Sequence, residues 1–600
     1  MLKIRRIFCV IFICLCSFPL FSQIYGKKQL IPANHWIYEA IYTLSLNVKD
    51  FTFADTAPLS IEELNYYLLK IDYEKLDDEN KKLYNEISDF FNKKTFSLSW
   101  NPVELGFNVK FFPEIMFKSN QNIDWSFATD FSGHPSSINY KYEQSSSSWN
   151  LENSSLNYGA ASNFQGNDIV KSILTFPIYI NFNDMAFFQG DFYLGNNFWT
   201  LSEDSNFTNA IKTFLESDTH FPNYVYGSVG YLWLSGLGVN LQVGKEGLQI
   251  GRSQTGSIIY NNTFETDFYL KLDLYSPKFK YNYELVEMNK DRYLYLHNFS
   301  FKPTNLFKVS LIEGTMINDA FELKYLNPLM LFHSFASWNQ YMTDDEAKIY
   351  GTAHASSYLA LTLDLIPIKN LRIYLNYCMT ELQIFTELKT PHGNAVPNGL
   401  GFQGGYEYNW ASKKDGFYYS GLELLYTSPY LYYKSGADWS LYRARYNVQK
   451  NATTPICSWI GTPFGPDSIA AQFRFGYRKI QKYSYELDYL FVAHGQNSFN
   501  LFNQKATDKN GKIWDAYYPA TLYELGILSA EEAADLARSW KLSGIIQFTH
   551  RLTAKGTFSI NKNFVLEGNI SYALVFNAKN IKNNFQQGVE MSFAVAFNLF

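Results

Sequence analysis

The feature that most constrains the fold of this chain is an alternation of apolar and polar residues that recurs from about residue 95 to the end. It is clear at 371–379, 483–494 and 564–576, where large apolar residues occupy every second position. A period of two is that of a β-strand with one apolar face. The segments are about ten residues long, which is the length of a tilted strand that spans a bilayer. The alternation therefore predicts an all-β transmembrane barrel.

Composition agrees with this prediction. Aromatic residues make up 18% of the chain and charged residues 18%, while an average soluble domain has about a quarter charged residues. The mean hydropathy of −0.21 is mildly polar. Many of the alternating segments begin or end in an aromatic residue, as the girdles of a membrane barrel require. Beyond residue 22 the sequence has no apolar run of 18 residues, so no transmembrane helix is predicted.

The length of the alternating region sets the size of the barrel. Residues 95–600, at about 25–30 residues for a strand and its connection, give about 16–18 antiparallel strands. A barrel of this size is wide enough for an aqueous lumen. The alternative is a secreted β-sandwich array or propeller, but the 40–50-residue repeat of a propeller is absent from the sequence.

Residues 1–22 have the pattern of a secretion signal. Lys3, Arg5 and Arg6 precede an apolar run from Ile7 to Leu15, as in a signal peptide. Loss of these three basic residues takes the net charge from −5 to −8, which argues against nucleic acid as a partner. We expect the mature chain in the cell outer membrane, as a monomer surrounded by outer-membrane lipid.

Residues 23–94 differ from the rest of the chain. Apolar residues follow helical spacing at 35–44 and at 73–91, and Ser60 with Glu63 forms a capping-box pattern. We predict a small periplasmic helical domain ahead of the barrel. It is either a plain structural plug or linker, or a module that docks on peptidoglycan or an assembly partner.

The carboxyl-terminal segment 588–600 alternates and ends at Phe600. A terminal aromatic strand resembles the signal that the barrel assembly machinery of the outer membrane reads. We therefore expect that machinery to be a partner through Phe600.

The segment from Gly251 to Ser257 has the glycine spacing of a phosphate-binding P-loop. That motif needs a Lys directly after its second Gly, and Ser257 stands there. The residues that follow, at 257–260, favour a strand rather than the helix that a P-loop opens. We interpret the segment as a glycine-rich turn between strands, not as a nucleotide site.

Patterns typical of enzymes are missing from the sequence. The nine histidines form neither H-x₃-H nor H-E-x-x-H, and no G-x-S-x-G motif occurs. The acidic cluster at 344–346 lacks the ligand spacing of a calcium loop. We expect no catalysis, no metal and no cofactor. Cys378 and Cys457 could form one disulfide, which the sequence does not decide.

Two segments resemble the capsule assembly protein Wzi family. The first is the glycine-rich stretch at 244–262, and the second is Tyr325-Leu-Asn-Pro328, interpreted as part of a strand. The residues that carry the resemblance are Gly244, Lys245, Glu246, Gly251, Gly256, Ser257, Asn327 and Pro328. The order of signal, small helical bundle and large barrel also fits. The resemblance implies a non-enzymatic outer-membrane lectin that binds surface polysaccharide or helps to organise it.

Aromatic rings suit sugars because their faces pack against C–H surfaces. The candidate sugar-binding residues in loops are Trp338, Tyr341, Tyr430, Tyr432, Tyr433, Trp439 and Trp459. Each could instead be an interfacial girdle residue.

The charged residues on the polar phase of the strands should line the lumen, since charge facing lipid is costly. They are Arg372, Glu423, Arg474, Glu486, Asp488 and Glu567. They could select solutes, anchor a plug or simply form salt bridges. An open lumen would favour the alternative function, a channel or porin for small solutes. A lumen blocked by aromatics such as Tyr374 and by folded-in loops would favour polysaccharide binding.

Overall fold

The computed structural model describes most of the chain. The described residues are 22–24, 26–33, 35–92, 94–100, 102–120, 141–142, 149–150, 172–196, 219–220, 225–261, 267–289, 292–318, 321–332, 355–413, 415–434, 439–449, 452–497, 501, 504–511, 513–561 and 563–599. The predicted signal falls almost entirely outside them, and so does Phe600.

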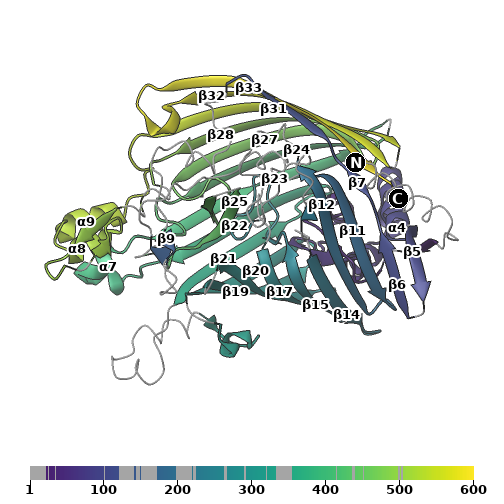
Figure 1. Cartoon of the computed structure of the whole chain (residues 1–600), viewed down its shortest axis with the longest axis horizontal. Helices are drawn as coiled ribbons and strands as arrows, with labels where there is room; N and C mark the ends of the chain where they lie inside the picture. The colour runs from purple at the N-terminus through teal and green to yellow at the C-terminus, as the bar shows by residue number, and fades with distance from the viewer. Residues whose placement is uncertain are drawn as a thin grey trace.

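A closed antiparallel barrel of 18 strands forms the body of the molecule (Figure 1). It closes where β33 pairs with β7 and β8, while β6 and β7 pair with β11 on their other side. A closed barrel leaves no free sheet edge. The predicted fold class, at the upper end of the predicted strand number, is confirmed.

The strands follow one another around the wall in chain order. They are β6, β7 and β8 (Val103–Phe107, Lys110–Phe111 and Glu114–Lys118, parts of one strand), β11 (Ser172–Phe182), β12 (Ala186–Asn196), β14 (Val225–Leu232), β15 (Gly238–Glu246), β17 (Asp267–Tyr275), β18 (Phe279–Asn289), β19 (Arg292–Thr304), β20 (Phe307–Asn318), β21 (Ala355–Leu365), β22 (Leu371–Glu381), β23 (Gly399–Ala411), β24 (Phe417–Thr427), β27 (Ser468–Lys479), β28 (Tyr483–His494), β31 (Gln547–Asn561), β32 (Phe564–Phe576) and β33 (Phe585–Asn598). β5 (Lys94–Trp100) pairs with β6 and with β1 (Ser22–Ile24), and β13 (Thr219–His220) pairs with β12.

The predicted alternation determines which side chains face the lumen. On β17, Lys271 and Asp273 point inward and are fully buried, whereas Phe268 on the other phase is exposed. The same holds on β28, where Tyr485 and Leu487 are exposed on the outside. The outer wall is thus apolar and the inner wall polar, the reverse of a soluble protein and the arrangement of a membrane barrel.

The two ends of the barrel differ in the length of their connections. At one end the turns are short, such as 276–278, 305–306 and 480–482. At the other end the loops are long, such as 382–398, 428–467 and 495–546. We refer to the short-turn end and the long-loop end. In Figure 1, α4 marks the first and α7, α8 and α9 mark the second.

The long loops carry their own small elements. These are η6 (Glu387–Lys389), α7 (Pro391–Ala395), β25 (Tyr442–Gln449), β26 (Ala452–Trp459), β29 (Lys505–Thr507), β30 (Ile513–Asp515), α8 (Pro519–Glu524), α9 (Ala530–Ala537) and η9 (Ala578–Asn580), with β9 (Lys141–Tyr142) paired with β10 (Trp149–Asn150).

The amino-terminal segment is helical, as its spacing predicts. It contains β2 (Leu30–Ile31), α2 (Trp36–Val48), β3 (Thr56–Ala57), β4 (Leu59–Ser60), α3 (Ile61–Lys70), η1 (Tyr73–Lys75) and α4 (Asp78–Phe91). Ser60 caps α3 by accepting a hydrogen bond from Glu63 N at 3.2 Å. The Glu63 side chain does not complete a capping box, because it pairs with Lys280 of the wall. Among the described helices, none is long and apolar enough to cross a membrane.

The segment at 321–332 corrects one prediction. It was expected to be a strand, but it forms η5 (Leu323–Leu326) and a turn. Pro328 has no N–H for a sheet ladder, and Asn327 caps the turn by accepting from Leu329 N at 3.1 Å.

Candidate functional site

The amino-terminal helical segment is bonded to the inner wall at the short-turn end of the barrel. We call residues 26–92 the plug. Tyr42 Oη donates to Asp364 on β21 at 3.4 Å. Asn47 Nδ2 donates to Asn370, in the turn after β21, at 3.0 Å. The plug therefore fills part of the lumen at this end.

Buried ion pairs fix the plug to the wall. Lys280 Nζ on β18 lies 2.6 Å from Glu63 of α3. Lys308 Nζ on β20 lies 2.7 Å from Asp55 of the plug and 3.2 Å from Asp364 of the wall. All five side chains are buried. Breaking one such pair leaves an uncompensated charge, which typically costs about 3–5 kcal/mol.

A second element lies beside the plug inside the lumen. We call residues 249–261 the crossing segment. Its β16 (Gln249–Ile250) pairs with β3 of the plug, and Gly251 N donates to the Asp55 carbonyl at 3.1 Å. At its other end Asn261 N donates to the carbonyl of Ile460, in a long loop, at 2.9 Å. The crossing segment thus links the plug to the loops at the opposite end.

Glu423 on β24 holds the middle of the crossing segment. Its carboxylate accepts from Gln254 N at 2.8 Å, from Thr255 N at 3.0 Å and from Thr255 Oγ1. Tyr374 Oη and Gln403 Nε2 donate to the same carboxylate at 2.5 and 3.1 Å. Glu423 is buried, so these five donors compensate a charge that is removed from water.

Arg252 connects the crossing segment to the plug electrostatically. Its guanidinium donates to Glu39 of α2, and also to Glu407 of β23 at 3.3 Å. Arg478 of β27 lies 2.7 Å from the same Glu39. Burial alone would raise the pKa of Glu39, but Arg252 and Arg478 outweigh burial and hold that pKa well below its usual range. The Glu39 carboxylate therefore stays ionised in mild acid.

The segment with the glycine spacing of a P-loop, 251–257, is part of the crossing segment inside the lumen. Ser257 Oγ accepts from Ile259 N at 3.1 Å, and Ile258 N donates to Gln403 at 3.2 Å. Backbone amides of the segment are thus bonded within the protein, at Gly251, Gln254, Thr255, Ile258 and Ile259. The strand expected at 257–260 is wrong: Tyr260 makes only an isolated bridge to Ile250.

Gly256 has a backbone conformation that other residues rarely adopt, with φ +96. A Cβ there would lie 2.5 Å from Asn261 Nδ2. We expect Gly256→Ala to destabilise the folded protein by about 1–3 kcal/mol, measured by urea unfolding. The control is Gly526→Ala, at φ +68 with nothing within 4 Å of the added atom, which should cost less. Equal effects at both sites would contradict the tight packing of Gly256.

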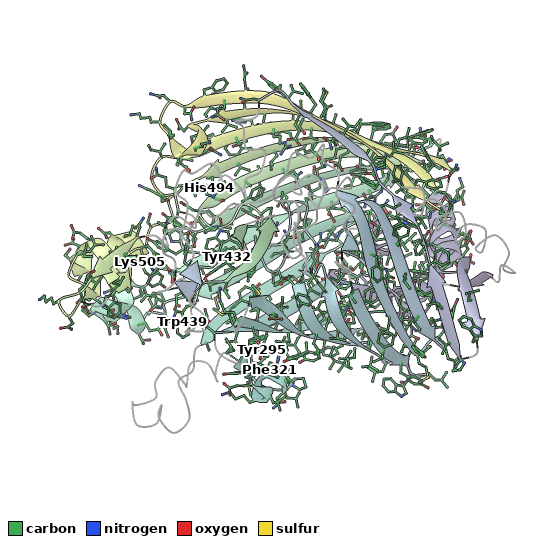
Figure 2. All side chains as sticks on the ribbon, in the orientation of Figure 1. Tyr295, Phe321, Tyr432, Trp439, His494 and Lys505 are labelled. Carbon is green, nitrogen blue, oxygen red and sulfur yellow. The ribbon has the colours of Figure 1, made fainter. Side chains whose placement is uncertain are left out.

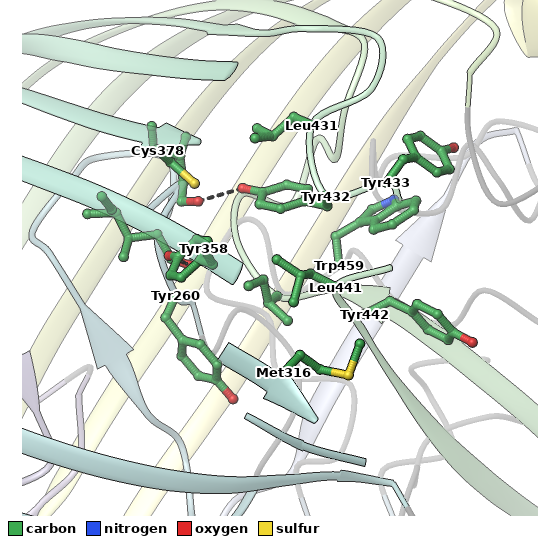
Figure 3. Packing of buried hydrophobic residues seen from close by; sticks show 14 of the residues in the cluster. Tyr260, Met316, Tyr358, Cys378, Leu431, Tyr432, Tyr433, Leu441, Tyr442 and Trp459 are labelled. Carbon is green, nitrogen blue, oxygen red and sulfur yellow. Dashed lines mark hydrogen bonds between the residues drawn. The ribbon is translucent and has the colours of Figure 1, made fainter. Parts of the chain in front are cut away.

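Aromatic rings pack on the long-loop side of the crossing segment (Figure 3). Tyr432 Oη donates to the Ile258 carbonyl at 2.5 Å. The Tyr432 ring stacks on Trp459 with centroids 6.1 Å apart, and Tyr433 meets Trp459 edge-on at 4.9 Å. We call these rings, with Tyr430, the aromatic cluster. It braces the loop 428–467 against the crossing segment.

The predicted sugar-binding residues lie in several environments. Tyr430, Tyr432, Tyr433 and Trp459 are buried, with 6% of Tyr430 exposed and less of the others. Their rings contact other protein rings. Trp439 is half-buried and lies toward the long-loop end in Figure 2. Trp338 and Tyr341 lie outside the described residues. The role of all of them in sugar binding stays a prediction.

The charged lumen residues fall into two groups. Arg372 and Glu423 anchor the crossing segment, since Arg372 Nη2 donates to the Arg252 carbonyl at 3.0 Å. The second group is on β27, β28 and β31, where Arg474 lies 3.6 Å from Glu486 and 3.7 Å from Asp488. Lys555, which sequence reasoning missed, lies 2.9 and 2.5 Å from the same carboxylates. Glu567 is half-buried on the inward phase of β32.

The side chains of Arg474 and Lys555 are each 28% exposed, whereas Lys280 and Lys308 are fully buried under the plug. The plug thus covers the wall around β18 and β20 more closely than the wall around β27 and β31.

The residues that carry the family resemblance lie in three different parts of the structure. Gly244, Lys245 and Glu246 end β15, where Lys245 Nζ lies 5.4 Å from the Phe268 ring centre and Glu246 accepts from Gly247 N at 2.9 Å. Gly251, Gly256 and Ser257 belong to the crossing segment. Asn327 and Pro328 belong to the turn after η5.

Some residues at the site were missed by sequence reasoning. Lys271, Lys280 and Lys308 contact the plug. The sequence feature that could have identified them is a lysine on the polar phase of an alternating strand. Trp540, which follows α9, is 55% exposed and stacks on Tyr426 of β24 at 5.7 Å.

Asp467 organises the base of the long loops. Its carboxylate accepts from Ser543 N at 3.0 Å, from Asn497 N at 2.9 Å and from Ser543 Oγ. Burial raises the pKa of Asp467 to about 6, although the hydrogen bonds from Ser543 and Asn497 act in the opposite direction.

The raised pKa of Asp467 predicts a pH dependence. Its contribution to stability is fully present below the unfolded pKa near 3.8 and is lost as pH rises through about 6. Amide exchange at Asn497 and Ser543, corrected for intrinsic rates, should therefore be slower at pH 5 than at pH 7. In Asp467→Asn, the exchange rates at pH 5 and pH 7 should differ less. If the pH dependence of exchange is unchanged in that variant, a group other than Asp467 causes it.

The described part of the chain holds no group of three His, Cys, Asp or Glu side chains placed to bind a metal. Cys378 is a buried free thiol, so the disulfide left open by the sequence is not formed.

The chain is an outer-membrane β-barrel protein, since its fold matches solved barrels of that membrane. It is similar to Wzi of Escherichia coli, described as an outer membrane protein involved in group 1 capsule assembly and a carbohydrate-binding β-barrel. That match has a TM-score of 0.52 and 11% identity, and covers 95% of this chain and 99% of Wzi. At this identity the match shows the fold alone.

A weaker match is OprD of Pseudomonas aeruginosa, with a TM-score of 0.36, 7% identity and coverage of 82% of this chain and 95% of OprD. No protein-family model and no curated protein matches the sequence. In outer-membrane barrels the short turns are periplasmic and the long loops extracellular. By this rule we expect the plug at the periplasmic end and the aromatic cluster toward the extracellular end.

Proposed function

We propose that this protein binds surface polysaccharide at its extracellular face, or organises the attachment of that polysaccharide, without catalysing a reaction. In this proposal it acts like a member of the Wzi family. The observation that carries the proposal is the filling of the lumen by the plug and the crossing segment, which leaves the barrel better suited to holding a ligand on its loops than to passing solutes.

The bracing of the long loops supports the proposal. The aromatic cluster and Asp467 hold the loops 428–467 and 495–546 in one arrangement. Preorganised loops lose less conformational entropy when they bind a ligand. The half-buried Trp439 and Trp514 lie in the long loops, and aromatic faces of this kind pack against sugar rings. The E. coli Wzi barrel, which shares the fold, is described as carbohydrate-binding.

A channel is the second candidate function. The observation that favours it is the partial exposure of Arg474 and Lys555 on the inner wall. A charged and hydrated strip beside the plug could conduct ions, with selectivity set by the two basic and two acidic side chains there.

Conductance and binding measurements distinguish the two functions. Refolded protein in a planar bilayer should be silent, and immobilised protein should retain polysaccharide extracted from the surface of the source cells. Stable current steps without retention would support the channel and contradict polysaccharide binding.

A pair of tryptophan variants localises the binding. Trp439→Ala should weaken retention several-fold, because it removes a ring from an extracellular loop. Trp100→Ala is the control: its ring is exposed at the end of β5, near the short turns. Equal loss in both variants would place the polysaccharide elsewhere.

A further inference from the structure

The segment 321–332 lies against the outside of the barrel wall; we call it the exterior clip. Tyr281 Oη donates to the Pro328 carbonyl at 2.7 Å, and Tyr283 Oη donates to the Tyr325 carbonyl at 2.8 Å. Both tyrosines are on the outward phase of β18, since the buried polar residues Lys280, Asn282 and Glu284 alternate with them on the inner side. Figure 2 shows Tyr295 and Phe321 together where the clip projects beyond the wall.

The clip covers the part of the wall that a bilayer would otherwise contact. Its Tyr325 and Phe332 belong to an apolar cluster against which Leu270, Leu272 and Leu274, the outward leucines of β17, also pack. It also covers His297 of β19, whose ring lies 4.2 Å from that of Phe332. The clip therefore shields a histidine on the outward phase of β19.

Hydrogen bonding within the clip fits such a place. Irregular backbone is tolerated at membrane depth only where its polar groups are satisfied by protein. The two tyrosine hydroxyls satisfy carbonyls, Met330 N donates to the Asn327 carbonyl at 3.1 Å, and Leu329 N donates to Asn327 Oδ1 at 3.1 Å. This accounts for the sequence Tyr-Leu-Asn-Pro, which polysaccharide binding does not explain.

Three leucines of the clip are strongly exposed, while the exposed polar residues are Lys324 near its start and Asn327 at its turn. Leu323, Leu329 and Leu331 are 75%, 86% and 65% exposed. The charged pair Glu322–Lys324, at 2.5 Å, follows Phe321, which packs on Tyr293 near the extracellular end of β19. Charge thus lies toward the membrane surface, while Pro328 reaches Tyr281 near the periplasmic end of β18.

We propose that the exterior clip is embedded in the outer membrane, where Leu323, Leu329 and Leu331 contact lipid acyl chains. Lipid is the occupant because the clip continues the lipid-facing surface of β17–β19. The clip adds an apolar ridge to the outside of the barrel and anchors residues 321–332 to the bilayer. This inference does not depend on the proposed polysaccharide binding.

Photolabelling of the intact protein in vesicles tests the inference. The probe is a phosphatidylethanolamine with a diazirine in its acyl chain, and hydroxyl radicals generated in water are the opposite probe. We expect acyl adducts at Leu329 and Leu331, with little oxidation there. The control is Leu234, fully exposed in the short turn 233–237, which should be oxidised and carry no adduct. Oxidation of Leu329 without acyl adducts would overturn the inference, whether the clip contacts water or another protein.

A charge substitution gives an independent measurement. Leu329→Arg should shift the unfolding equilibrium in vesicles at least tenfold toward the unfolded form, because a charged side chain on the lipid face is costly. Leu234→Arg should shift it little. Equal shifts would mean that Leu329 is not in the bilayer. If Leu329→Arg does not fold, the photolabelling of the unaltered protein still shows whether Leu329 contacts lipid.

Discussion

Replacing Lys308 with methionine is expected to release the plug from the barrel wall. Lys308 lies between Asp55 of the plug and Asp364 of the wall, and all three side chains are buried. Without the ammonium group, Asp55 loses its ion-pair partner and faces the carboxylate of Asp364, which stays paired with Arg372. The free energy required to open the plug should fall by about 3–5 kcal/mol. Amide exchange along α2 and α3 should rise by roughly two to three and a half orders of magnitude.

Two variants make this result specific. Lys75→Met removes a lysine from the same plug, but one that is exposed and paired with Asp72 at the surface, so amide exchange in α2 should not change. Lys308→Met combined with Asp55→Asn removes the carboxylate that lost its partner and should recover part of the protection. If Lys308→Met leaves α2 and α3 as protected as in the unaltered protein, the ion pairs do not hold the plug.

The orientation of side chains in the wall could be predicted from the sequence, because a period of two places each residue on one face of a strand. Arg372 and Glu423 point inward as the alternation predicts. What they bind could not be predicted in this way. Their partners, Arg252 and Thr255, lie more than a hundred residues away in sequence, and no local pattern encodes a contact at that separation.

The crossing segment shows how the lumen overrides local propensity. Ser257-Ile-Ile-Tyr260 has the residues of a strand. Inside the lumen its amides and carbonyls bond to side chains of the wall and the loops, as in Ile258 N to Gln403 and Tyr432 Oη to Ile258 O. These partners replace a neighbouring strand, so the backbone stays irregular even though its residues favour a sheet.

The aromatic residues were the hardest to place from the sequence. The sequence around a tyrosine looks the same whether the residue lies in a loop, in an interfacial girdle or in a packed cluster. Tyr432 is buried because the crossing segment supplies a carbonyl for its hydroxyl, whereas Trp540 is exposed beside Tyr426. The difference depends on which long loops meet above the lumen, and alternation carries no information about that.

Replacing Glu423 with alanine is expected to free the crossing segment. The change leaves Gln254 N, Thr255 N and Thr255 Oγ1 without their acceptor. Each buried donor left unpaired costs about 1–3 kcal/mol, so the total should be at least about 3 kcal/mol. Amide exchange at 254–258 should rise by at least 10²-fold. Glu423→Gln keeps an acceptor oxygen and should show a smaller rise, while Glu567→Ala, elsewhere on the inner wall, should show none.

The same variant tests how the two ends of the molecule depend on each other. The crossing segment lies in the lumen and also supports Tyr432. Under the proposed function, its release should allow ionic current and weaken polysaccharide retention together. Current with full retention would mean that the extracellular loops keep their shape without support from below. Lost retention without current would mean that the plug alone closes the barrel. If neither changes while exchange at 254–258 stays slow, Tyr432, Gln403 and Arg372 hold the segment without Glu423.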